Sequence, residues 1–458
     1  MPPSFFLPAE NASEIVGDGP LASGKSALSL PSAVASAPAT RVKGFAPALS
    51  AASADPGEGE PLLEQYDVLV VGGGPAGSTA AWAAARKGAR VALLEACSVP
   101  RGKLCGGLLS RKTIGMLHRL HGMDERALRD CGIIGFSSSR YDVFFGDRLL
   151  CSDRYEYPFH FTERAVFDAW LLEQARQAGV AIFSKASVVW ADTREGSVHL
   201  ADGRRTRGRF LIGADGVNSA VRRAFPIDRR RWARSLAATV EVRLPRADLP
   251  HAPDKPQIFL GWLAEGYGWV FPQRDFVVVG LGGKLDRARE RSFAKLFRRF
   301  LEQVGVRDSP LQPLHGHPLP YGGYLPPLVC GRGLLAGDAG GLVESVFGEG
   351  IFFAMRSGEL AGEIAARSCT EGKAGTGIAQ YPALLREDVL AEIAASRRVQ
   401  RCIALCGRYE LLHPVLRWGV LRGRRALLDV IHGRRSYRHF RRLPDTDSRV
   451  AERQTFPS

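Results

Sequence analysis

Apolar and polar positions divide the chain into a start without periodicity, a mixed α/β body and a helical end. Residues 1–64 are rich in Ser, Ala, Pro and Gly and predict a disordered leader. Order begins with the apolar run 66–71, which indicates a buried parallel strand. An Ala-rich helix is predicted over 76–87 and a second strand over 90–94. The body therefore opens with a strand–helix–strand unit.

Later segments continue this mixture of helices and strands without an internal repeat. We expect an amphipathic helix over 163–178, hairpin strands over 180–200, a short strand over 210–214, strand-rich sequence over 235–285, and a strand, glycine loop and helix over 334–366. From about residue 380 the pattern is helical and amphipathic. The pattern thus predicts the α/β (α+β) class.

The composition is that of a globular protein. Of 458 residues, 45% are apolar and 24% charged, and no window holds 18 consecutive apolar residues, which argues against a transmembrane helix. The eight cysteines are scattered, with neither a CxxC pair nor a Cys/His metal spacing. We therefore predict a reducing, cytoplasmic location, no disulfide framework and no metal site.

The net charge of +15 is concentrated near the C-terminus. Between Arg397 and Arg442 there are thirteen arginines, no lysine and two acids, which leaves +11 in this segment. Such a basic amphipathic stretch can contact an anionic membrane surface, and we expect peripheral membrane association; a solvated helical face is the alternative. No nucleic-acid-binding motif accompanies the charge, so no nucleic-acid partner is predicted.

A dinucleotide fingerprint, G-x-G-x-x-G, stands between the first strand and its helix. The first glycine permits a tight turn, the second admits a pyrophosphate close to the backbone, and the third lets helix and strand pack closely. A carboxylate at the end of the second strand can bind ribose hydroxyls. The candidate cofactor contacts in this unit are Gly72, Gly74, Pro75, Ala76, Gly77 and Glu95.

Two later strand-to-loop segments indicate which dinucleotide is bound. Phe210–Ser219 and Leu334–Gly341 resemble the Asp-Gly and Gly-Asp motifs of the p-hydroxybenzoate-hydroxylase-like flavoproteins. The resemblance implies FAD, with Asp338 on a ribityl hydroxyl and the helix from Ile351 directed at the flavin N1/O2 edge, where a helix N-terminus stabilises negative charge. The candidate contacts here are Asp215, Gly216, Asp338, Gly348, Gly350 and Ile351. Gly280-Leu-Gly282-Gly283 lacks a third glycine, and we interpret it as the end of a hairpin.

Four further stretches resemble the geranylgeranyl reductase family, over roughly residues 66 to 366. They are Arg101–Leu108, similar to a K-x-C-G-G loop; Arg164–Asp168; Tyr267–Pro272, similar to Y-x-W-x-F-P; and Gly348–Gly358. The resemblance adds Lys103, Gly106 and Arg164 to the candidate flavin contacts. The family signature usually opens with Pro three residues before the tyrosine, where this chain has Ala264.

Four residues are candidates for substrate chemistry. Tyr267, Trp269 and Phe271 alternate along a strand and therefore point to one face, which we expect to line a substrate pocket; buried sheet aromatics are the alternative. Cys105 is our candidate catalytic residue, as a proton donor or a substrate contact, because flanking glycines and Lys103 suit an accessible, electropositive site. The alternative for Cys105 is a small buried hydrophobe.

The resemblance implies a Rossmann-type FAD-binding domain interleaved with an antiparallel-sheet substrate domain, followed by a helical segment. The expected division is a leader at 1–64, FAD-binding parts at 65–135, 161–225 and 326–368, substrate-domain parts at 136–160 and 226–325, and a C-terminal helical region at 369–458.

The implied activity is reduction of C=C bonds in a polyprenyl substrate by hydride from reduced flavin. Electrons would come from NAD(P)H or from a ferredoxin-like electron-transfer protein, because no nicotinamide domain is evident. The alternatives are an FAD-dependent aromatic or polyketide monooxygenase or halogenase-like enzyme on the same scaffold, and a flavin- or lipid-binding protein without turnover.

Overall fold

The computed structural model describes residues 65–440 with gaps at 250–251, 286–289, 291, 307–315, 322–323, 371–376 and 409–422. The leader predicted for residues 1–64 lies outside the described residues, as do residues 409–422 and 441–442 of the arginine-rich segment.

The first sheet has a parallel centre. β1 (Gln65–Val71) pairs in parallel with β2 (Val91–Leu94) and β9 (Arg205–Gly213), β2 with β6 (Ala181–Phe183), and β9 with β16 (Gly333–Leu335). Antiparallel neighbours extend it: β15 (Val329–Cys330), β7 (Val188–Asp192) and β8 (Ser197–Leu200). Val68, Leu69 and Val70 are fully buried, as expected of a strand covered on both faces.

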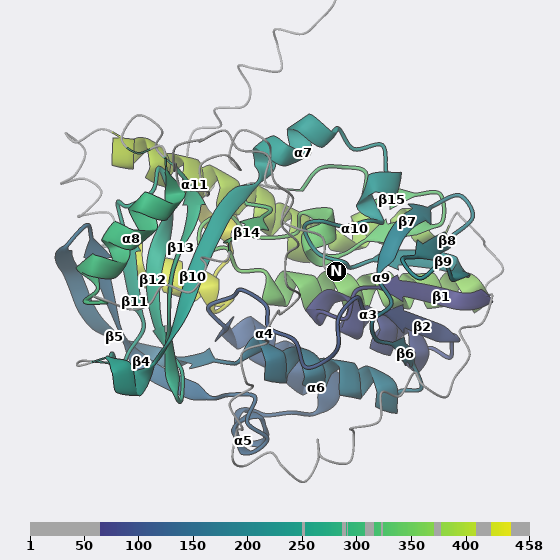
Figure 1. Cartoon of the computed structure of the whole chain (residues 1–458), viewed down its shortest axis with the longest axis horizontal. Helices are drawn as coiled ribbons and strands as arrows, with labels where there is room; N and C mark the ends of the chain where they lie inside the picture. The colour runs from purple at the N-terminus through teal and green to yellow at the C-terminus, as the bar shows by residue number, and fades with distance from the viewer. Residues whose placement is uncertain are drawn as a thin grey trace, which may run out of the picture.

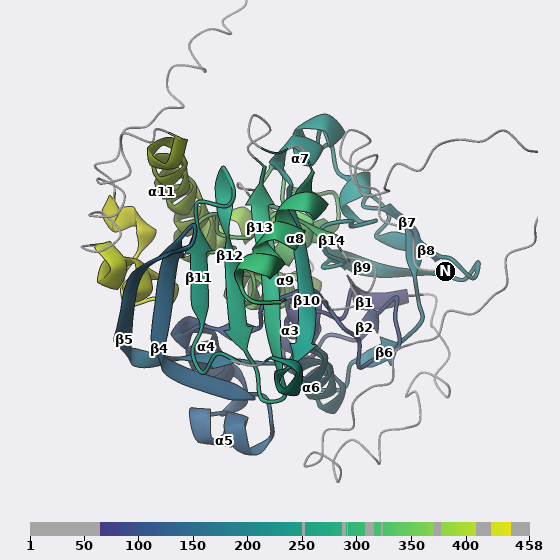
Figure 2. The same cartoon turned by 60° about the vertical axis from the view of Figure 1, so that its left-hand side comes forward.

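The second sheet is mostly antiparallel, with its strands in the order β14-β10-β13-β12-β11-β4-β5-β3. Their bounds are β3 (Leu108–Leu109), β4 (Phe136–Phe145), β5 (Arg148–Phe161), β10 (Ala237–Pro245), β11 (Gln257–Leu260), β12 (Glu265–Pro272), β13 (Phe276–Lys284) and β14 (Gly316–Leu319). Helix α8 (Phe293–Gln303) covers one face, where Phe297 and Phe300 are fully buried (Figure 2). The opposite face carries Trp269 and Phe271.

Two helices that follow glycine turns of the first sheet pack against each other. α3 (Pro75–Arg86) packs along α9 (Ile351–Thr370), between the two sheets in Figure 1. A Cβ on Gly358 or Gly362 would lie 2.1 Å from the carbonyl oxygen of Ala76 or Ala80. The helices can therefore approach this closely only because glycine stands at both crossing points.

The remaining helices lie around this frame, and none of the helices within the described residues is long and apolar enough to cross a membrane. Their bounds are α4 (Arg111–His121), α5 (Glu125–Asp130), α6 (Arg164–Gln177), α7 (Arg229–Ser235), α10 (Tyr381–Leu385) and α11 (Ala391–Arg408), with single turns η1 (Arg222–Ala224), η2 (Arg246–Asp248), η3 (Gly337–Gly340), η4 (Ile378–Gln380) and η7 (Tyr437–Phe440) and a π-helical turn η5 (Arg386–Leu390).

The mixed α/β class and the opening strand–helix–strand unit are confirmed. The predicted hairpin over 180–200 is only partly right, because β7 and β8 form a hairpin whereas β6 joins β2 in parallel. Gly280–Gly283, interpreted as the end of a hairpin, lie towards the open end of the β12–β13 hairpin. These residues lie inside β13, paired with β12 and β10, and the turn of the hairpin is at 273–275. The domain boundaries stay a prediction.

Candidate active site

Glycine turns from three distant parts of the chain meet at one end of the first sheet. A Cβ on Gly72 would lie 2.4 Å from the carbonyl oxygen of Ala214, in the second turn. A Cβ on Gly337, in the third turn, would lie 2.9 Å from the Cβ of Ala76. Both glycines have positive φ, at +102° and +57°, which side chains rarely adopt. The three turns are therefore packed backbone to backbone.

Gly74 and Gly77 of the fingerprint have different roles, as the motif predicts. A Cβ on Gly77 would lie 1.8 Å from the carbonyl oxygen of Gly72, so this glycine is needed for the turn to close. Gly74 caps helix α3 without a side-chain hydrogen bond, and a Cβ there would meet nothing nearer than Nη2 of Arg101, at 3.5 Å. The space above Gly74 and the helix N-terminus, which starts with Pro75 and Ala76, can therefore receive an anion.

Glu95 follows β2 directly and is buried beside the fingerprint. Its Oε2 accepts a hydrogen bond from the Gly73 backbone N–H at 2.7 Å, and its Oε1 accepts one from the Cys97 N–H at 3.0 Å. The Arg101 Nε lies 3.2 Å from Oε1, and the same guanidinium lies 3.6 Å from Asp168. Arg101 lies in a motif recognised in the sequence, but it was not predicted to be a site residue.

Arg164 and Cys105 come together at the start of α6. Arg164 is buried and holds Asp168 through two hydrogen bonds of 2.9 Å, and its guanidinium also forms a hydrogen bond with the Cys105 side chain. Burial alone would lower the pKa of Arg164, but Asp168 and Cys105 raise it above its usual value. The Cys105 sulfur accepts a further hydrogen bond from the Gly107 N–H at 3.4 Å. The thiol therefore faces a permanent cation, the Arg164 guanidinium.

A second charged pair lies between the K-x-C-G-G loop and the third turn. The Lys103 Nζ lies 3.0 Å from Oδ2 of Asp338. Burial alone would raise the pKa of Asp338, but the Lys103 ammonium lowers it. His317 faces this pair, and burial together with Lys103 lowers its pKa to about 4, so the imidazole is neutral at pH 7.

The loop before α9 brings a helix N-terminus to Asp338. A Cβ on Gly350 would lie 3.7 Å from the Asp338 Oδ1, and Ile351 begins the helix. Gly348, with φ +66°, turns the chain into this segment. The structure thus brings Asp338, Gly348, Gly350 and Ile351 together.

A buried carboxylate, Glu344, holds the same loop in shape. It accepts hydrogen bonds from the Phe347 N–H at 2.6 Å and the Glu349 N–H at 3.0 Å. The Tyr437 hydroxyl donates to its Oε2 at 2.8 Å, so the C-terminal turn η7 also braces the loop. The sequence alone did not identify Glu344 or Tyr437 as part of the site.

The Asp215 carboxylate is engaged within its own turn. It accepts hydrogen bonds from the Ser219 hydroxyl and from the backbone N–H groups of Ala220, at 2.6 Å, and Val221, at 3.2 Å. The next residue, Gly216, has φ +75° and open space where a Cβ would stand. Asp215 therefore shapes the turn, and the backbone at Gly216 is the part that can approach a ligand.

The three aromatic residues of β12 form a row, as their alternation predicts. The ring centroids of Tyr267 and Trp269 are 5.8 Å apart, and those of Trp269 and Phe271 6.3 Å. A Cβ on Gly106 would lie 2.6 Å from the Phe271 ring, and one on Gly280 would lie 2.3 Å from the Trp269 ring. The row therefore fits only because glycine occupies the loop and the neighbouring strand.

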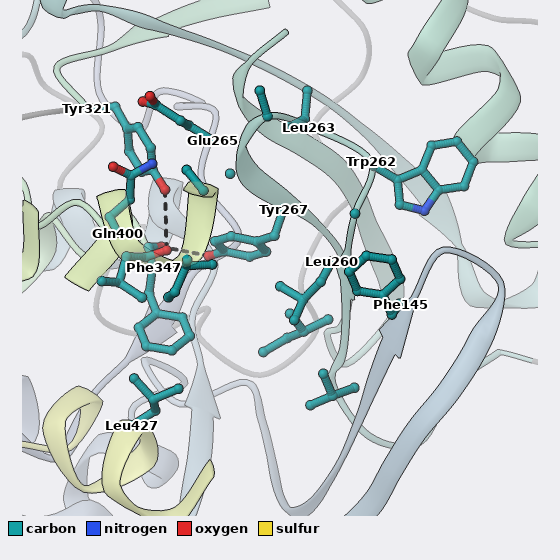
Figure 3. A pocket seen from close by; sticks show the side chains of 18 of the residues that line it. Phe145, Leu260, Trp262, Leu263, Glu265, Tyr267, Tyr321, Phe347, Gln400 and Leu427 are labelled. Carbon is teal, nitrogen blue, oxygen red and sulfur yellow. Dashed lines mark hydrogen bonds between the residues drawn. The ribbon is translucent and has the colours of Figure 1, made fainter. Parts of the chain in front are cut away.

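A cavity of about 590 Å³ opens at the Tyr267 end of this row (Figure 3). Trp269 and Phe271 are buried and do not line it, so only Tyr267 of the predicted trio does. The Tyr267 hydroxyl donates to the Phe347 carbonyl oxygen at 2.6 Å, which ties the cavity wall to the loop before α9. The apolar lining includes Phe145, Ile258, Leu260, Trp262, Val346 and Phe347, and the polar lining Glu265, Arg299, Tyr321, Gln400 and Arg424.

The residues present fit FAD. The N-terminus of α3, capped by Gly74, has no side-chain hydrogen bond. Glu95 supplies a buried carboxylate, and the Asp338 carboxylate lies beside the start of α9. These are the features that a pyrophosphate, a ribose and a ribityl chain require. The role of each candidate residue stays a prediction.

Comparisons with known proteins agree with this geometry. Residues 65–381 match the family described as an FAD binding domain. A geranylgeranyl diphosphate reductase from Synechocystis sp. is 30% identical over 330 residues, covering 67% of this chain and 76% of the relative. A digeranylgeranylglycerophospholipid reductase from Methanococcoides burtonii is 30% identical over 323 residues, covering 68% and 76%.

Solved structures share the fold. A geranylgeranyl bacteriochlorophyll reductase-like protein from Thermoplasma acidophilum has a TM-score of 0.66 at 23% identity, covering 86% of this chain and 97% of that one. A probable FAD-dependent monooxygenase from Pseudomonas aeruginosa has a TM-score of 0.58 at 19% identity, covering 77% and 99%. Since the sequence relatives match most of both chains at 30% identity, this protein belongs to the geranylgeranyl reductase family of FAD-dependent oxidoreductases.

Proposed function

We propose that the protein reduces C=C bonds of a polyprenyl substrate. The observation that carries the proposal is the largely apolar cavity that adjoins the aromatic row of β12. Its volume is within the range of small-molecule sites, and its lining suits a long hydrocarbon. Two relatives at 30% identity are named for reductions of geranylgeranyl compounds.

The cavity offers different chemistry at its two ends. Figure 3 shows Glu265, Tyr321 and Gln400 gathered together, whereas Leu260 and Phe145 lie apart from them on another side of the cavity. We infer that the polar group of the substrate lies near the first set and its hydrocarbon along the second. The loop of Cys105 and Gly106 does not line this cavity but packs against Phe271 at the far end of the aromatic row, so we infer that the isoprenoid reaches Cys105 from the Tyr267 end.

The protein's part in the reaction would be to orient the chain, exclude water and supply a proton. Bound FAD, once reduced, would supply the hydride. We propose that Cys105, beside Arg164 and the Gly107 N–H, donates a proton to the second carbon of the double bond. The electron donor, either NAD(P)H or a ferredoxin-like protein, belongs to the same proposal.

An anaerobic reaction tests the function. The purified protein, reduced under nitrogen, should be reoxidised by a geranylgeranyl compound with formation of the saturated product. Substrate-stimulated oxygen uptake would indicate a monooxygenase instead, and neither response to any polyprenyl or aromatic compound would indicate a binding protein.

Trp269→Ala should weaken substrate binding and leave FAD bound. The indole fills the space over Gly280, so its loss removes the middle of the aromatic row. We expect KM to rise about tenfold, corresponding to about 1.4 kcal/mol, with an unchanged flavin spectrum. Steady-state kinetics and visible absorption are the measurements. A variant that fails to fold would instead indicate that Trp269 is a core aromatic.

We also propose that the arginine-rich end brings the enzyme to anionic lipid, where such a substrate would dissolve. Among its described residues, Arg424 pairs with Asp153 and Arg435 with Asp429, which reduces the charge that these arginines offer. Co-sedimentation with liposomes should increase with anionic lipid content. Sedimentation that is indifferent to lipid charge would contradict the proposal.

A further inference from the structure

A buried carboxylate, Glu241, lies beside the aromatic row, on the face of the second sheet that carries Trp269. Glu241 in β10 pairs with Gly280 in β13, which pairs with Trp269 in β12. Directly paired residues point to the same face, so the glutamate and the indole face the same side with only a glycine between them. Trp269 covers Gly280, and its ring therefore extends towards Glu241.

Glu241 is buried, and only one of its two oxygens has a partner. Oε1 accepts a hydrogen bond from the Cys105 backbone N–H at 2.9 Å, whereas Oε2 has no partner within the described residues. Two other buried atoms on this face, the Trp269 Nε1 and the Thr239 Oγ1, are likewise without a described partner. Because an unsatisfied buried polar group costs about 1–3 kcal/mol, three of them on one face indicate that a water or a ligand belongs there.

The surroundings of Glu241 favour a proton on its carboxyl group. Burial raises its pKa to about 7, while the Cys105 N–H and the cations of Arg243 and Arg164 oppose the rise. Those are the charged groups that face it from its own strand and from α6. Strands β13 and β12 contribute Gly280 and Trp269, and β14 contributes His317, which pairs with Thr239 on the same face. The carboxyl is thus protonated below pH 7 and ionised above it, near physiological pH.

Glu241 is hydrogen-bonded to the backbone of Cys105 itself. The N–H that Glu241 binds belongs to the same residue as the thiol, and three covalent bonds separate that nitrogen from Sγ. The unpartnered Oε2 is free to accept a hydrogen bond from, or donate one to, a water that bridges to that loop.

We propose that Glu241 is the proton reservoir of the reduction, which passes its proton to Cys105. The inference rests on the proposed function. One alkene carbon would receive a hydride from reduced FAD, which would thereby be oxidised by two electrons, and the other would receive the Cys105 proton. Two C–H bonds would form, while the C=C π bond, the S–H bond and the bond that held the hydride on the flavin would break. The Glu241 O–H then restores the thiol, and the Glu241 carboxylate regains its proton from solvent.

Glu241→Gln tests the proposal, because the amide oxygen can still accept the Cys105 N–H while the transferable proton is lost. The matched control is Glu302→Gln, at an exposed position of α8 on the opposite face of the same sheet. The first readout, made on the FAD-loaded protein without substrate, is the rate of Cys105 alkylation by iodoacetamide between about pH 5 and 9, followed by peptide mass spectrometry.

Ionisation of Glu241 should oppose thiolate formation at Cys105. We therefore expect the alkylation rate of the wild type to rise with pH over a broader range than the titration curve of a single group. In Glu241→Gln the rate should follow the titration curve of a single group, and near pH 8 it should be several-fold higher than in the wild type. Identical profiles in the two proteins would overturn the coupling.

The second readout is anaerobic reoxidation by a geranylgeranyl compound. In the wild type the rate should fall as pH rises through about 7, and in Glu241→Gln it should be about 10- to 100-fold lower below pH 7 and lose that step. Full activity in Glu241→Gln would overturn the proposal that Glu241 is the proton reservoir. If the wild type reduces no polyprenyl compound, the proposed function fails, and the alkylation profiles still decide whether Glu241 controls Cys105.

Discussion

Gly74→Val should lose most of its affinity for FAD while the protein stays folded. Gly74 stands at the N-cap of α3 in an extended conformation, φ −79° and ψ −175°, which valine adopts readily. A Cβ there meets only the flexible end of Arg101 at 3.5 Å, so the apoprotein has room for it. The valine methyl groups would, however, occupy the space through which a pyrophosphate approaches the helix N-terminus.

We expect the dissociation constant of FAD to rise at least about 100-fold, or about 3 kcal/mol, with a melting temperature of the apoprotein close to that of the wild type. Titration of apoprotein with FAD, followed by flavin fluorescence, measures the first, and calorimetry the second. Gly115→Ala, at an exposed position in α4 with no atom within 4 Å of the new Cβ, is the control that should bind normally. FAD affinity unchanged in Gly74→Val would refute the assignment of the pyrophosphate site.

Gly77→Ala provides the contrast within the same motif. Its Cβ would lie 1.8 Å from the Gly72 carbonyl oxygen, so this substitution forces the turn itself to move. Unlike Gly74→Val, it should destabilise the apoprotein as well. The two glycines are thus required for different reasons, one for ligand approach and one for packing.

Features coded within a few adjacent residues were predictable from sequence. The spacing of Gly72, Gly74 and Gly77 after an apolar run predicted the turn between strand and helix. The alternation of Tyr267, Trp269 and Phe271 predicted that the three side chains share one face of a strand. Both depend on local geometry, which a periodicity of two or a glycine spacing expresses directly.

Features created by contact between distant segments were not predictable. Glu241 is one acid within an alternating strand, and it matters because it reaches Cys105, 136 positions earlier. Arg101 gains its place from Glu95 and from Asp168 in a later helix. The need for glycine at position 280 was not predictable, because nothing in the sequence shows that the Trp269 ring lies over it. The cavity, built from several separated segments, has no local signal at all.

Cys105→Ser should abolish most of the turnover and leave FAD bound. Serine keeps the size of the side chain and can hydrogen-bond Arg164 and the Gly107 N–H, so the loop need not move. Its hydroxyl, however, is a far weaker acid than a thiol and cannot deliver a proton at a useful rate. Because a positioned proton donor contributes about 10²- to 10⁴-fold to rate, we expect single-turnover reoxidation by substrate to slow at least about 100-fold.

The control for this substitution is Cys97→Ser, an exposed cysteine in the preceding loop that should react at the wild-type rate. Stopped-flow absorption under nitrogen measures the reoxidation, and the visible spectrum before mixing reports whether FAD is in place. Two results separate chemistry from packing: a slow Cys105→Ser protein with a normal spectrum supports a proton donor, whereas a Cys105→Ser protein with full turnover means that the sulfur only fills space beside Arg164.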